Sequence, residues 1–286
     1  MKNTHTNELA VCGFEAVRAL ADVHPERIRR LYFTRERASA FGGTCRQLAA
    51  QKRPYNTVEA EELEKLCGSV HHQGVVAMIA TPRLTALTSD ITDGWLHGHE
   101  SALLLDRVGN ANNLGAIVRS AAFFGFRNII IPLDEAQSSV TTSSYRVAQG
   151  GMEFVRLYTV RSVTKLLTAL HGKMVRLGTA VDAATPVSDL PRLCGGKGAL
   201  IVLGNEEHGI SHEVKQLCDA LVTIPAGGAP LAQTGADDGK AVDSDSAVGA
   251  HNGTRAGTGT RAPQQPIESL NVAQAAAIIL YECRKR

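Results

Sequence analysis

The chain has 286 residues, of which 44% are hydrophobic and 20% are charged, and its formal net charge at pH 7 is +2. This composition predicts a globular protein with a full core and two domains, and the small net charge does not by itself indicate a nucleic-acid partner. No apolar run approaches the ~18 residues of a membrane span, and the first residues lack the basic-then-apolar pattern of a secretory signal. We therefore expect a cytoplasmic protein with no membrane partner.

Six dispersed cysteines form no Cys-x-x-Cys pair, and no histidine stands at zinc-ligand spacing. We expect reduced thiols, with neither a disulfide framework nor a structural metal. Basic side chains are dense between residues 27 and 37. A solvated face is the simpler interpretation of this density, and a nucleic-acid contact is the alternative. The cluster comprises Arg27, Arg29, Arg30, Arg35 and Arg37.

Short elements alternate in the first part of the chain. They are a helix after Gly13, an apolar run at 28–34, an acidic helix closed by Gly68 and a strand at 75–80. This alternation predicts a small N-terminal α/β domain over residues 1–81. Residues 82–100 have weak periodicity and several turn formers, which is typical of a linker.

From residue 101 onwards the pattern becomes that of a parallel sheet. A strand at 101–105, a helix at about 114–124 and a strand at 128–132 make one βαβ unit. Four later apolar runs continue the pattern, at 154–160, 174–180, 199–204 and 221–225. The sequence therefore predicts a larger domain over 101–286 whose ligand lies at the carboxyl ends of the strands.

One segment of this larger domain differs in composition. Residues at about 230–266 are rich in Gly, Ala, Ser, Thr and Asp and contain no aromatic side chain. Such a segment buries too little apolar surface to offset the entropy of ordering it, so we expect a disordered insertion.

Three polar motifs follow predicted strands. In the first, Asn113 can cap a helix, Gly115 leaves room for close backbone approach, and Arg119 lies on the same helical face as Gly115. A capped helix with Arg119 in a surface ion pair explains the same residues. Spacing alone does not choose between this structure and a binding site.

The second motif follows a buried strand directly. Gly204 lets the chain turn, and Glu206 then lies at the mouth of the next loop, with Glu207 and His208 beside it. Side chains at neighbouring positions diverge, which disfavours a metal site.

The third motif joins Ile224 and Pro225, at the end of a strand, to Ser269, Leu270 and Asn271 at the start of the last helix. Ser269 is a natural N-cap, and hydrogen bonding at the helix start is a structural explanation of Asn271. No Gly-x-Ser-x-Gly elbow surrounds Ser269, which disfavours a hydrolase triad. The chain also lacks a P-loop and a Gly-x-Gly-x-x-Gly sequence, so phosphate-cradling nucleotide chemistry is disfavoured.

Together the motifs NxGxxxR, LGxE and IPxxG…SLNVA resemble those of the SpoU (TrmH) family of the SPOUT superfamily, the RNA ribose 2'-O-methyltransferases, in the family's order. GFEAVRAL at 13–20 and HHQGVVA at 71–77 resemble the family's small substrate-binding domain. The resemblance implies a SPOUT-type parallel sheet with a C-terminal trefoil knot and a small N-terminal domain like ribosomal protein L30e. It also implies a homodimer.

The resemblance further implies that S-adenosyl-L-methionine binds inside the knot and that no metal is required. Carried onto this sequence, the cofactor site falls on Gly204, Ile224 and Leu270, lined by Leu203, Pro225 and Ala273. The catalytic side maps to Asn113, Arg119, Glu206, Ser269 and Asn271, and Arg119 corresponds to the family's principal catalytic residue.

The implied reaction is an in-line transfer of a methyl group from a sulfonium to a ribose hydroxyl, accelerated mainly by alignment of the reacting atoms. A guanidinium with a pKa above ~12 is a poor base. We therefore expect Arg119 to grip the target phosphate as a fork, with Asn113 and Asn271 fixing that fork and Glu206 balancing its charge.

Two features depart from the family's pattern. The family's third motif runs almost without interruption, whereas a long segment intervenes here, which we expect to be one enlarged surface loop. Glu207 stands where many relatives have glycine.

The leading hypothesis is a ribose 2'-O-methyltransferase acting on tRNA or rRNA. The alternative is a catalytically silent RNA-binding or ribosome-assembly protein with the same fold, and intact motif residues favour the enzyme. A dinucleotide-binding oxidoreductase lacks its phosphate fingerprint. The RNA and the nucleotide stay open.

Overall fold

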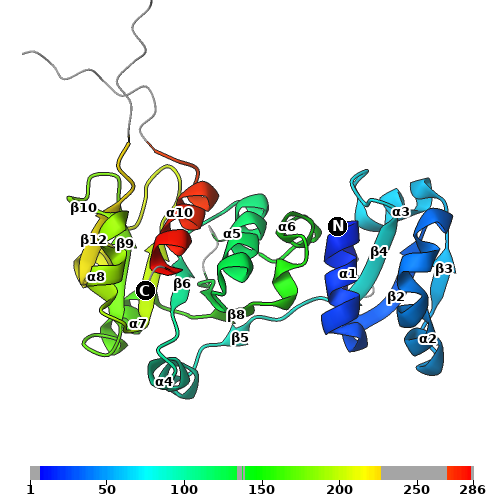
Figure 1. Ribbon diagram of the computed structural model, residues 1–286, viewed down its shortest axis with the longest axis horizontal. Coiled ribbons are helices and arrows are strands. Elements are labelled where there is room, and N and C mark those ends of the chain that lie inside the picture. The colour runs from blue at the N-terminus through cyan, green and yellow to red at the C-terminus, as the bar shows by residue number, and fades with distance from the viewer. Residues whose placement is uncertain (1–6, 134–136, 138, 227–268, 285–286) are drawn as a thin grey trace, which may run out of the picture. The chain divides into compact units, whose positions relative to one another are not determined.

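The computed structural model describes residues 7–133, 137, 139–226 and 269–284 (Figure 1). The predicted disordered insertion at about 230–266 lies outside the described residues. No helix among the described residues is long and apolar enough to cross a membrane.

The first sheet has four strands in the order β1-β4-β2-β3, with β4 antiparallel to both neighbours and β2 parallel to β3. Its elements in chain order are β1 (Glu8–Cys12), α1 (Phe14–Val23), β2 (Ile28–Phe33), α2 (Gly42–Ala50), β3 (Tyr55–Thr57), α3 (Ala60–Cys67) and β4 (Val75–Ala80). Two short 3-10 helices join them, η1 (Pro25–Arg27) and η2 (Arg35–Phe41). The elements expected after Gly13, before Gly68 and at 75–80 are confirmed.

Both faces of this first sheet are covered. Alternate residues of β1 and β4 point to opposite sides because the side-chain period of a strand is two. Leu9 and Val11 join the core that α1 covers, whereas Ala10 and Cys12 pack with Leu63 of α3. The apolar runs of β1 and β4 are therefore continuous rather than alternating.

Part of the segment expected to be a linker is folded. It forms β5 (Thr85–Ala86), which pairs in parallel with β8 (Arg156–Thr159), and α4 (Ser89–His97). The Trp95 ring of α4 is buried and packs edge-on against Tyr158, with ring centroids 5.4 Å apart. This helix has nine residues, fewer than the window over which a helical period is recognised, which explains why its periodicity is weak.

The second sheet has eight strands in the order β10-β12-β9-β11-β6-β7-β8-β5, and every pair is parallel. Its remaining strands are β6 (Ala102–Leu105), β7 (Asn128–Ile130), β9 (Val175–Thr179), β10 (Thr185–Pro186), β11 (Ala199–Leu203) and β12 (Ala220–Thr223). Every residue of the central strands β6 and β11 is buried, as expected for a parallel sheet covered on both faces. The predicted parallel α/β domain is confirmed.

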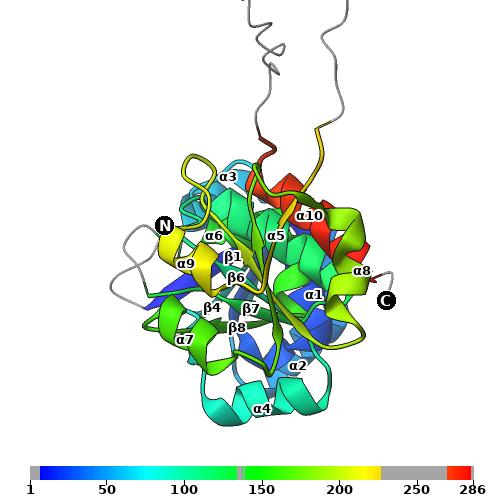
Figure 2. The same ribbon diagram turned by 90° about the vertical axis from the view of Figure 1, so that its left-hand side faces the viewer.

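Helices cover both faces of the second sheet. They are α5 (Ala111–Phe124), α6 (Thr142–Ala148), α7 (Val163–Ala169), α8 (Leu190–Cys194), α9 (His212–Leu217) and α10 (Val272–Arg284), with the 3-10 helices η3 (Gly151–Glu153) and η4 (Val187–Asp189). The last helix, α10, lies along α5 and also contacts α8 (Figure 2).

Two predicted helix caps are wrong by a few residues. The N-cap of α5 is Asn110, whose side chain accepts a hydrogen bond from the Asn112 N–H at 2.8 Å, so Asn113 lies inside the first turn. At α10 the capping side chain is Asn271, which accepts from the Ala273 N–H at 2.9 Å, rather than Ser269. Both asparagines of the motifs are therefore fixed relative to helix starts.

Candidate functional site

The residues of the three motifs gather at the carboxyl edge of the parallel sheet. Gly204 directly follows β11, Ile224 directly follows β12, and Asn113 lies in the first turn of α5, which follows β6. The start of α10 lies beside that first turn, because Asn271 bonds Asn113. Segments far apart in the chain thus meet at one edge, where parallel sheets bind ligands.

Three of the predicted catalytic side chains form one hydrogen-bonded chain. The Nδ2 of Asn113 donates to the Glu206 carboxylate, and the Nδ2 of Asn271 donates to the Oδ1 of Asn113 at 3.2 Å. The Oδ1 of Asn271 in turn accepts from the backbone of Ala273 at 2.9 Å. The amide of each asparagine is therefore oriented from both ends, and the position of the Glu206 carboxylate is set by the starts of two helices.

The loop that carries Glu206 is a tight turn built by Asn205. Backbone hydrogen bonds join Asn205 and Gly209 in both directions, at 2.9 and 3.2 Å. The Asn205 side chain accepts from the backbone of Glu207 at 2.8 Å and His208 at 3.2 Å, and donates to the Arg107 carbonyl at 3.1 Å. Sequence reasoning missed this residue, although an asparagine just after a strand is a known turn signal.

Gly204 is needed by the same turn. A Cβ on Gly204 would lie 2.3 Å from the carbonyl carbon of Gly209 and 2.3 Å from the nitrogen of Ile210. Both are backbone atoms, so no side-chain rotation relieves the clash. Only glycine lets the loop fold back over the end of β11.

The residues predicted to bind the cofactor differ in exposure. Leu203, Gly204 and Ala273 are buried, Ile224 packs against the core, and Leu270 is 43% exposed. Because β9 separates β11 from β12 in the sheet, their carboxyl ends lie two strand spacings, roughly 10 Å, apart. These residues therefore line a narrow part of the sheet edge with small or apolar groups, and Pro225, which follows Ile224, is exposed.

Arg119 stands apart from the asparagine and glutamate chain. It is exposed on α5 and makes no hydrogen bond or ion pair with any residue that the structure describes. Gly115, one turn earlier, allows α6 to approach closely, since a Cβ there would lie 2.5 Å from the Ser144 carbonyl oxygen. The backbone of Arg119 packs against Gly151, since a Cβ on Gly151 would lie 3.1 Å from the Cα of Arg119. The guanidinium is left free.

Ser269 is exposed and has no hydrogen bond to a described residue. The described residues contain no group of three His, Cys, Asp or Glu side chains placed to hold a metal ion.

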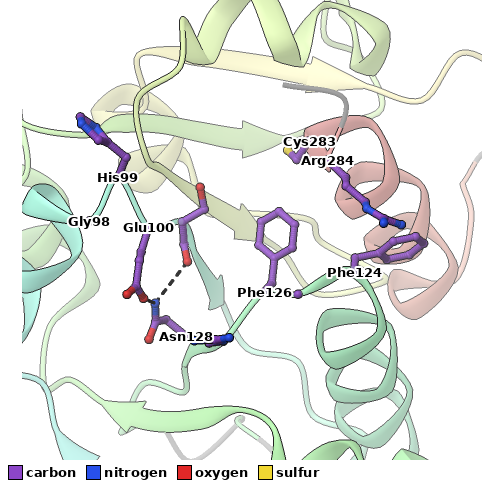
Figure 3. A pocket seen from close by; sticks show the side chains of 11 residues that line it. Gly98, His99, Glu100, Phe124, Phe126, Asn128, Cys283 and Arg284 are labelled. Atoms are coloured by element: carbon purple, nitrogen blue, oxygen red, sulfur yellow. Dashed lines mark hydrogen bonds between the residues drawn. The ribbon is translucent and has the colours of Figure 1, made fainter.

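A cavity of about 330 Å³ lies at the opposite edge of the sheet, where β6 and β7 begin (Figure 3). Its lining includes His99, Glu100, Phe126 and the buried Asn128, whose Nδ2 donates to the Glu100 carboxylate at 2.7 Å. None of the predicted site residues lines it, so this cavity and the motif residues are separate features.

Comparison with known families gives two matches along the chain. Residues 100–230 match the SpoU rRNA Methylase family, and residues 10–85 match the family described as RNA 2'-O ribose methyltransferase substrate binding. The two matched ranges cover most of the strands of the eight-stranded and four-stranded sheets and contain all of the first two motifs.

Curated relatives align over much of the chain. A 23S rRNA (guanosine-2'-O-)-methyltransferase RlmB from a Burkholderia species is 30% identical over 76% of this chain and 86% of its own length. The RlmB of Acinetobacter baylyi is 29% identical over 96% of both chains. An uncharacterized tRNA/rRNA methyltransferase of Haemophilus influenzae is 32% identical over 60% of this chain, which spans about half (48%) of that relative's length.

Solved structures share the fold. The SpoU methyltransferase AviRb from Streptomyces viridochromogenes, in complex with AdoMet, superposes with a TM-score of 0.64 at 21% identity, covering 99% of this chain and 91% of that one. An AdoMet-bound rRNA methyltransferase from Sinorhizobium meliloti gives 0.65 at 19% identity, with coverage of 98% and 88%. The α/β architecture with its parallel sheet is therefore shared with these proteins.

Proposed function

The chain belongs to the SpoU rRNA methylase family, and from this we propose that it transfers a methyl group from S-adenosyl-L-methionine to the 2'-hydroxyl of a ribose in RNA. The observation that carries the proposal is the hydrogen-bonded chain of Asn113, Glu206 and Asn271. These side chains come from three separate motifs and meet at the sheet edge where a parallel fold binds its ligand.

We propose that S-adenosyl-L-methionine binds along the ends of β11 and β12 and the first turn of α10. Residues Leu203, Gly204 and Ala273 fit such a ligand because they are small or apolar and leave main-chain groups at the edge. Ile224, Pro225 and Leu270 complete the lining. The bound cofactor supplies an electrophilic methyl group on a sulfonium, and no metal is needed for that transfer.

The role of this chain's side chains is orientation. Arg119 presents a free guanidinium, which grips a phosphate bidentately and thereby places the neighbouring ribose hydroxyl. Asn113, Asn271 and Glu206 form a fixed polar surface beside the sheet edge where the cofactor is proposed to bind. Ser269 is exposed two residues before Asn271. Alignment of this kind accounts for much of the acceleration of a group transfer.

We propose that the protein acts as a homodimer through α5 and α10. Large apolar side chains are exposed on these two packed helices, namely Phe123 (77%), Ile278 (36%) and Tyr281 (51%). Arg119 precedes Phe123 by one helical turn and so lies on the same face of α5. A dimer through this face brings Arg119 towards the partner subunit, which would complete a site that one protomer leaves open.

The finer fold features are proposals of the same kind. A C-terminal trefoil knot is supported by the position of β11 between β6 and β9 and by the packing of α10 on α5 and α8. We propose the domain division 1–81, 82–100 and 101–286, with an L30e-like N-terminal domain that binds RNA. We propose that the substrate of the protein is rRNA or tRNA in the cytoplasm. The first candidate is 23S rRNA, because relatives are named for it.

The test is methyl transfer by the purified full-length protein to in vitro transcripts of 23S rRNA, 16S rRNA and tRNA, followed by mapping of 2'-O-methylation. We expect one modified ribose in one RNA, no dependence on magnesium beyond RNA folding, and a loss of methyl transfer on the order of 100-fold or more with Arg119→Ala. RNA binding without cofactor binding would instead establish a catalytically silent RNA-binding or ribosome-assembly protein.

A further inference from the structure

We propose that Arg37 binds a phosphate of the RNA backbone, in a preformed site made by the first turn of α1, the turn at 71–74 and the start of η2. The inference rests on the proposed function only in that its ligand is RNA. It assigns a residue-level contact to the four-stranded sheet domain and uses two motifs, at 13–20 and 71–77, that the catalytic site leaves unexplained.

Arg37 is held in place through part of its guanidinium. The guanidinium carbon lies 4.6 Å from the centroid of the Phe14 ring, and Nε donates to the Gln73 carbonyl at 3.1 Å. Its two terminal amino groups make no hydrogen bond to a described residue. An arginine fixed in this way has lost its rotamer freedom already and presents the planar fork that matches a phosphate.

The platform beneath Arg37 is itself fixed. The Phe14 N–H donates to the Gln73 Oε1 at 2.8 Å, and the Phe14 ring packs edge-on against Phe41 with centroids 6.0 Å apart. The ring therefore joins the core on one side and carries Arg37 on the other. Each contact that orients Arg37 comes from a group that is oriented in turn.

The turn at 71–74 has the conformation that this arrangement needs. Gln73 and Gly74 both have positive φ, at 55° and 80°. A Cβ on Gly74 would lie 2.9 Å from the Thr34 Oγ1 and 3.0 Å from the Arg37 Cγ, so a side chain there would push Arg37 aside. Left-handed non-glycine residues are uncommon and concentrate at functional sites.

Three other arginines of the 27–37 cluster have structural partners. Arg27 pairs with Glu153 at 2.5 Å, and Arg29 and Arg30 both pair with Glu8. Arg18 also lies over the Phe14 ring, at 5.5 Å, but it is ion-paired with Glu15 at 2.5 Å.

Arg37 differs from these arginines because it forms no ion pair with a described carboxylate, although a hydrogen bond from Thr34 and, to a smaller extent, the charge of Arg37 help to lower the pKa of the exposed Glu36. Arg27, Arg29 and Arg30 of the sequence cluster are therefore ion-paired within the fold, whereas Arg37 is oriented without an ion pair. The neighbouring Glu36 and Arg35 are exposed and carry opposite charges. The proposed phosphate contact therefore depends on the fixed orientation of Arg37 rather than on a patch of positive charge.

A second arginine lies near Gly13, the residue that precedes α1. The Cγ of Arg146, on α6, lies 3.9 Å from the position that a Cβ on Gly13 would take. Arg146 makes no hydrogen bond to any residue within the described ranges, so it provides a second unpaired cation next to the first turn of α1.

The test measures the affinity of the full-length protein for an in vitro 23S rRNA transcript between 50 and 200 mM salt, the range over which phosphate contacts act. Arg37→Ala should weaken binding by roughly tenfold and reduce the slope of log affinity against log salt by about one. Arg37→Lys should keep the slope but recover only part of the affinity, since a lysine makes no fork. Arg46→Ala is the matched control, because Arg46 is exposed on α2 of the same sheet domain and lacks a described partner.

Unchanged cofactor binding and circular dichroism show that each variant is folded. A wild-type slope for Arg37→Ala, or an equal loss for Arg46→Ala, overturns the proposal. Because RNA binding is read without methyl transfer, the two hypotheses separate. A reduced slope in a protein that methylates nothing sustains the phosphate site and sinks the enzyme, whereas active enzyme with an unchanged slope does the reverse.

Discussion

Asn271 donates a hydrogen bond to the side chain of Asn113 at 3.2 Å, although the two residues are 158 positions apart in the chain. Asn113 uses its own amide donor on Glu206, so the three side chains form a directed series rather than a loose cluster. The start of α10 is thereby tied to the start of α5 at the edge where the cofactor is proposed to bind. Polar series of this kind are rigid when each member is satisfied.

The first prediction follows from that series. Asn113→Ala should lower kcat by roughly 10- to 100-fold, because it removes the bond to the Glu206 carboxylate, and a hydrogen bond to a charged group contributes about 1.5–3 kcal/mol. Asn271→Ala should lower kcat by roughly tenfold, because it removes a bond between neutral amides, about 0.5–1.5 kcal/mol, that orients Asn113. The double variant should lose much less than the product of the two, since residues in one network couple. Kinetics with saturating RNA measure this, with exposed Asn56→Ala as the control. Strictly multiplicative losses would show that the two asparagines act separately.

The second prediction concerns Arg119. Replacement by Ala or Lys should lower methyl transfer by on the order of 100-fold or more, because neither side chain reproduces a planar bidentate donor. Cofactor affinity measured by calorimetry should not change, since Arg119 makes no contact with the proposed cofactor edge. Turnover close to normal in Arg119→Ala would remove Arg119 from the site.

The third prediction concerns the turn after β11. Gly204→Ala should weaken cofactor binding by about 100-fold while the protein stays folded, because the added Cβ meets the backbone of Gly209 and Ile210 at 2.3 Å and displaces the loop. Gly43→Ala is the control, since a Cβ there meets nothing within 4 Å. Normal cofactor affinity in Gly204→Ala would mean that the loop is not part of the binding edge.

The sequence predicts the parallel sheet well because its strands are buried on both faces and read as continuous apolar runs. It does not predict the strand order. β11 lies between β6 and β9, and its pairs with β6 join residues about a hundred positions apart in the chain, which no local pattern records.

The motif residues at the strand ends follow from the same apolar runs. Three of them, Asn113, Glu206 and Asn271, are brought together as expected, whereas Arg119 stands apart on the exposed side of α5. Helix starts are harder, because several capping residue types stand side by side. In NANN the cap is Asn110, and in SLN it is Asn271; backbone geometry decides between neighbours that are equal in propensity.

The fourth prediction concerns the ion pair between Arg176, near the start of β9, and Asp219, just before β12. Arg176 is 4% exposed and is bonded by Asp219 through its backbone N–H, Nε and a terminal amino group, at 2.8, 3.1 and 2.5 Å. Asp219→Asn should lower the free energy of unfolding at pH 7 by about 2 kcal/mol, because it leaves a buried guanidinium without its counter-charge. Asp182→Asn, at a solvent-exposed pair with Lys215, should have little effect.

The same pair fixes a pH dependence. The hydrogen bond from Arg176 holds the pKa of Asp219 below its ordinary value. The stability that Asp219 contributes is therefore complete above the unfolded-state pKa of about 3.9 and is lost as pH falls through the lower folded pKa. The gap between wild type and Asp219→Asn in urea melts should close only in acid. A gap that stays constant down to pH 2 would contradict this assignment.

The fifth prediction concerns the contact between Arg27 and Glu153. Arg27 donates to the Glu153 carboxylate at 2.5 Å and to the Tyr145 hydroxyl at 2.8 Å, and the second oxygen of the buried Glu153 has no partner among the described residues. Burial raises the pKa of Glu153, and Arg27 opposes that rise. Because the pKa of Glu153 is higher in the folded state, protonated Glu153 contributes stability below the unfolded-state pKa of about 4.3. That contribution to the free energy of unfolding is lost as pH rises through the folded-state pKa.

Arg27→Ala should therefore destabilise the protein by about 3 kcal/mol at pH 7.5 and by less at pH 4, since it leaves a buried carboxylate unpaired. Arg27→Ala combined with Glu153→Gln should recover most of that loss at pH 7.5, because the unpaired charge is gone. Urea unfolding of the full-length chain at the two pH values measures both effects. If the double variant were as unstable as Arg27→Ala at pH 7.5, the loss would come from the packing of the arginine stem rather than from the buried charge, and the pH dependence assigned to Glu153 would be wrong.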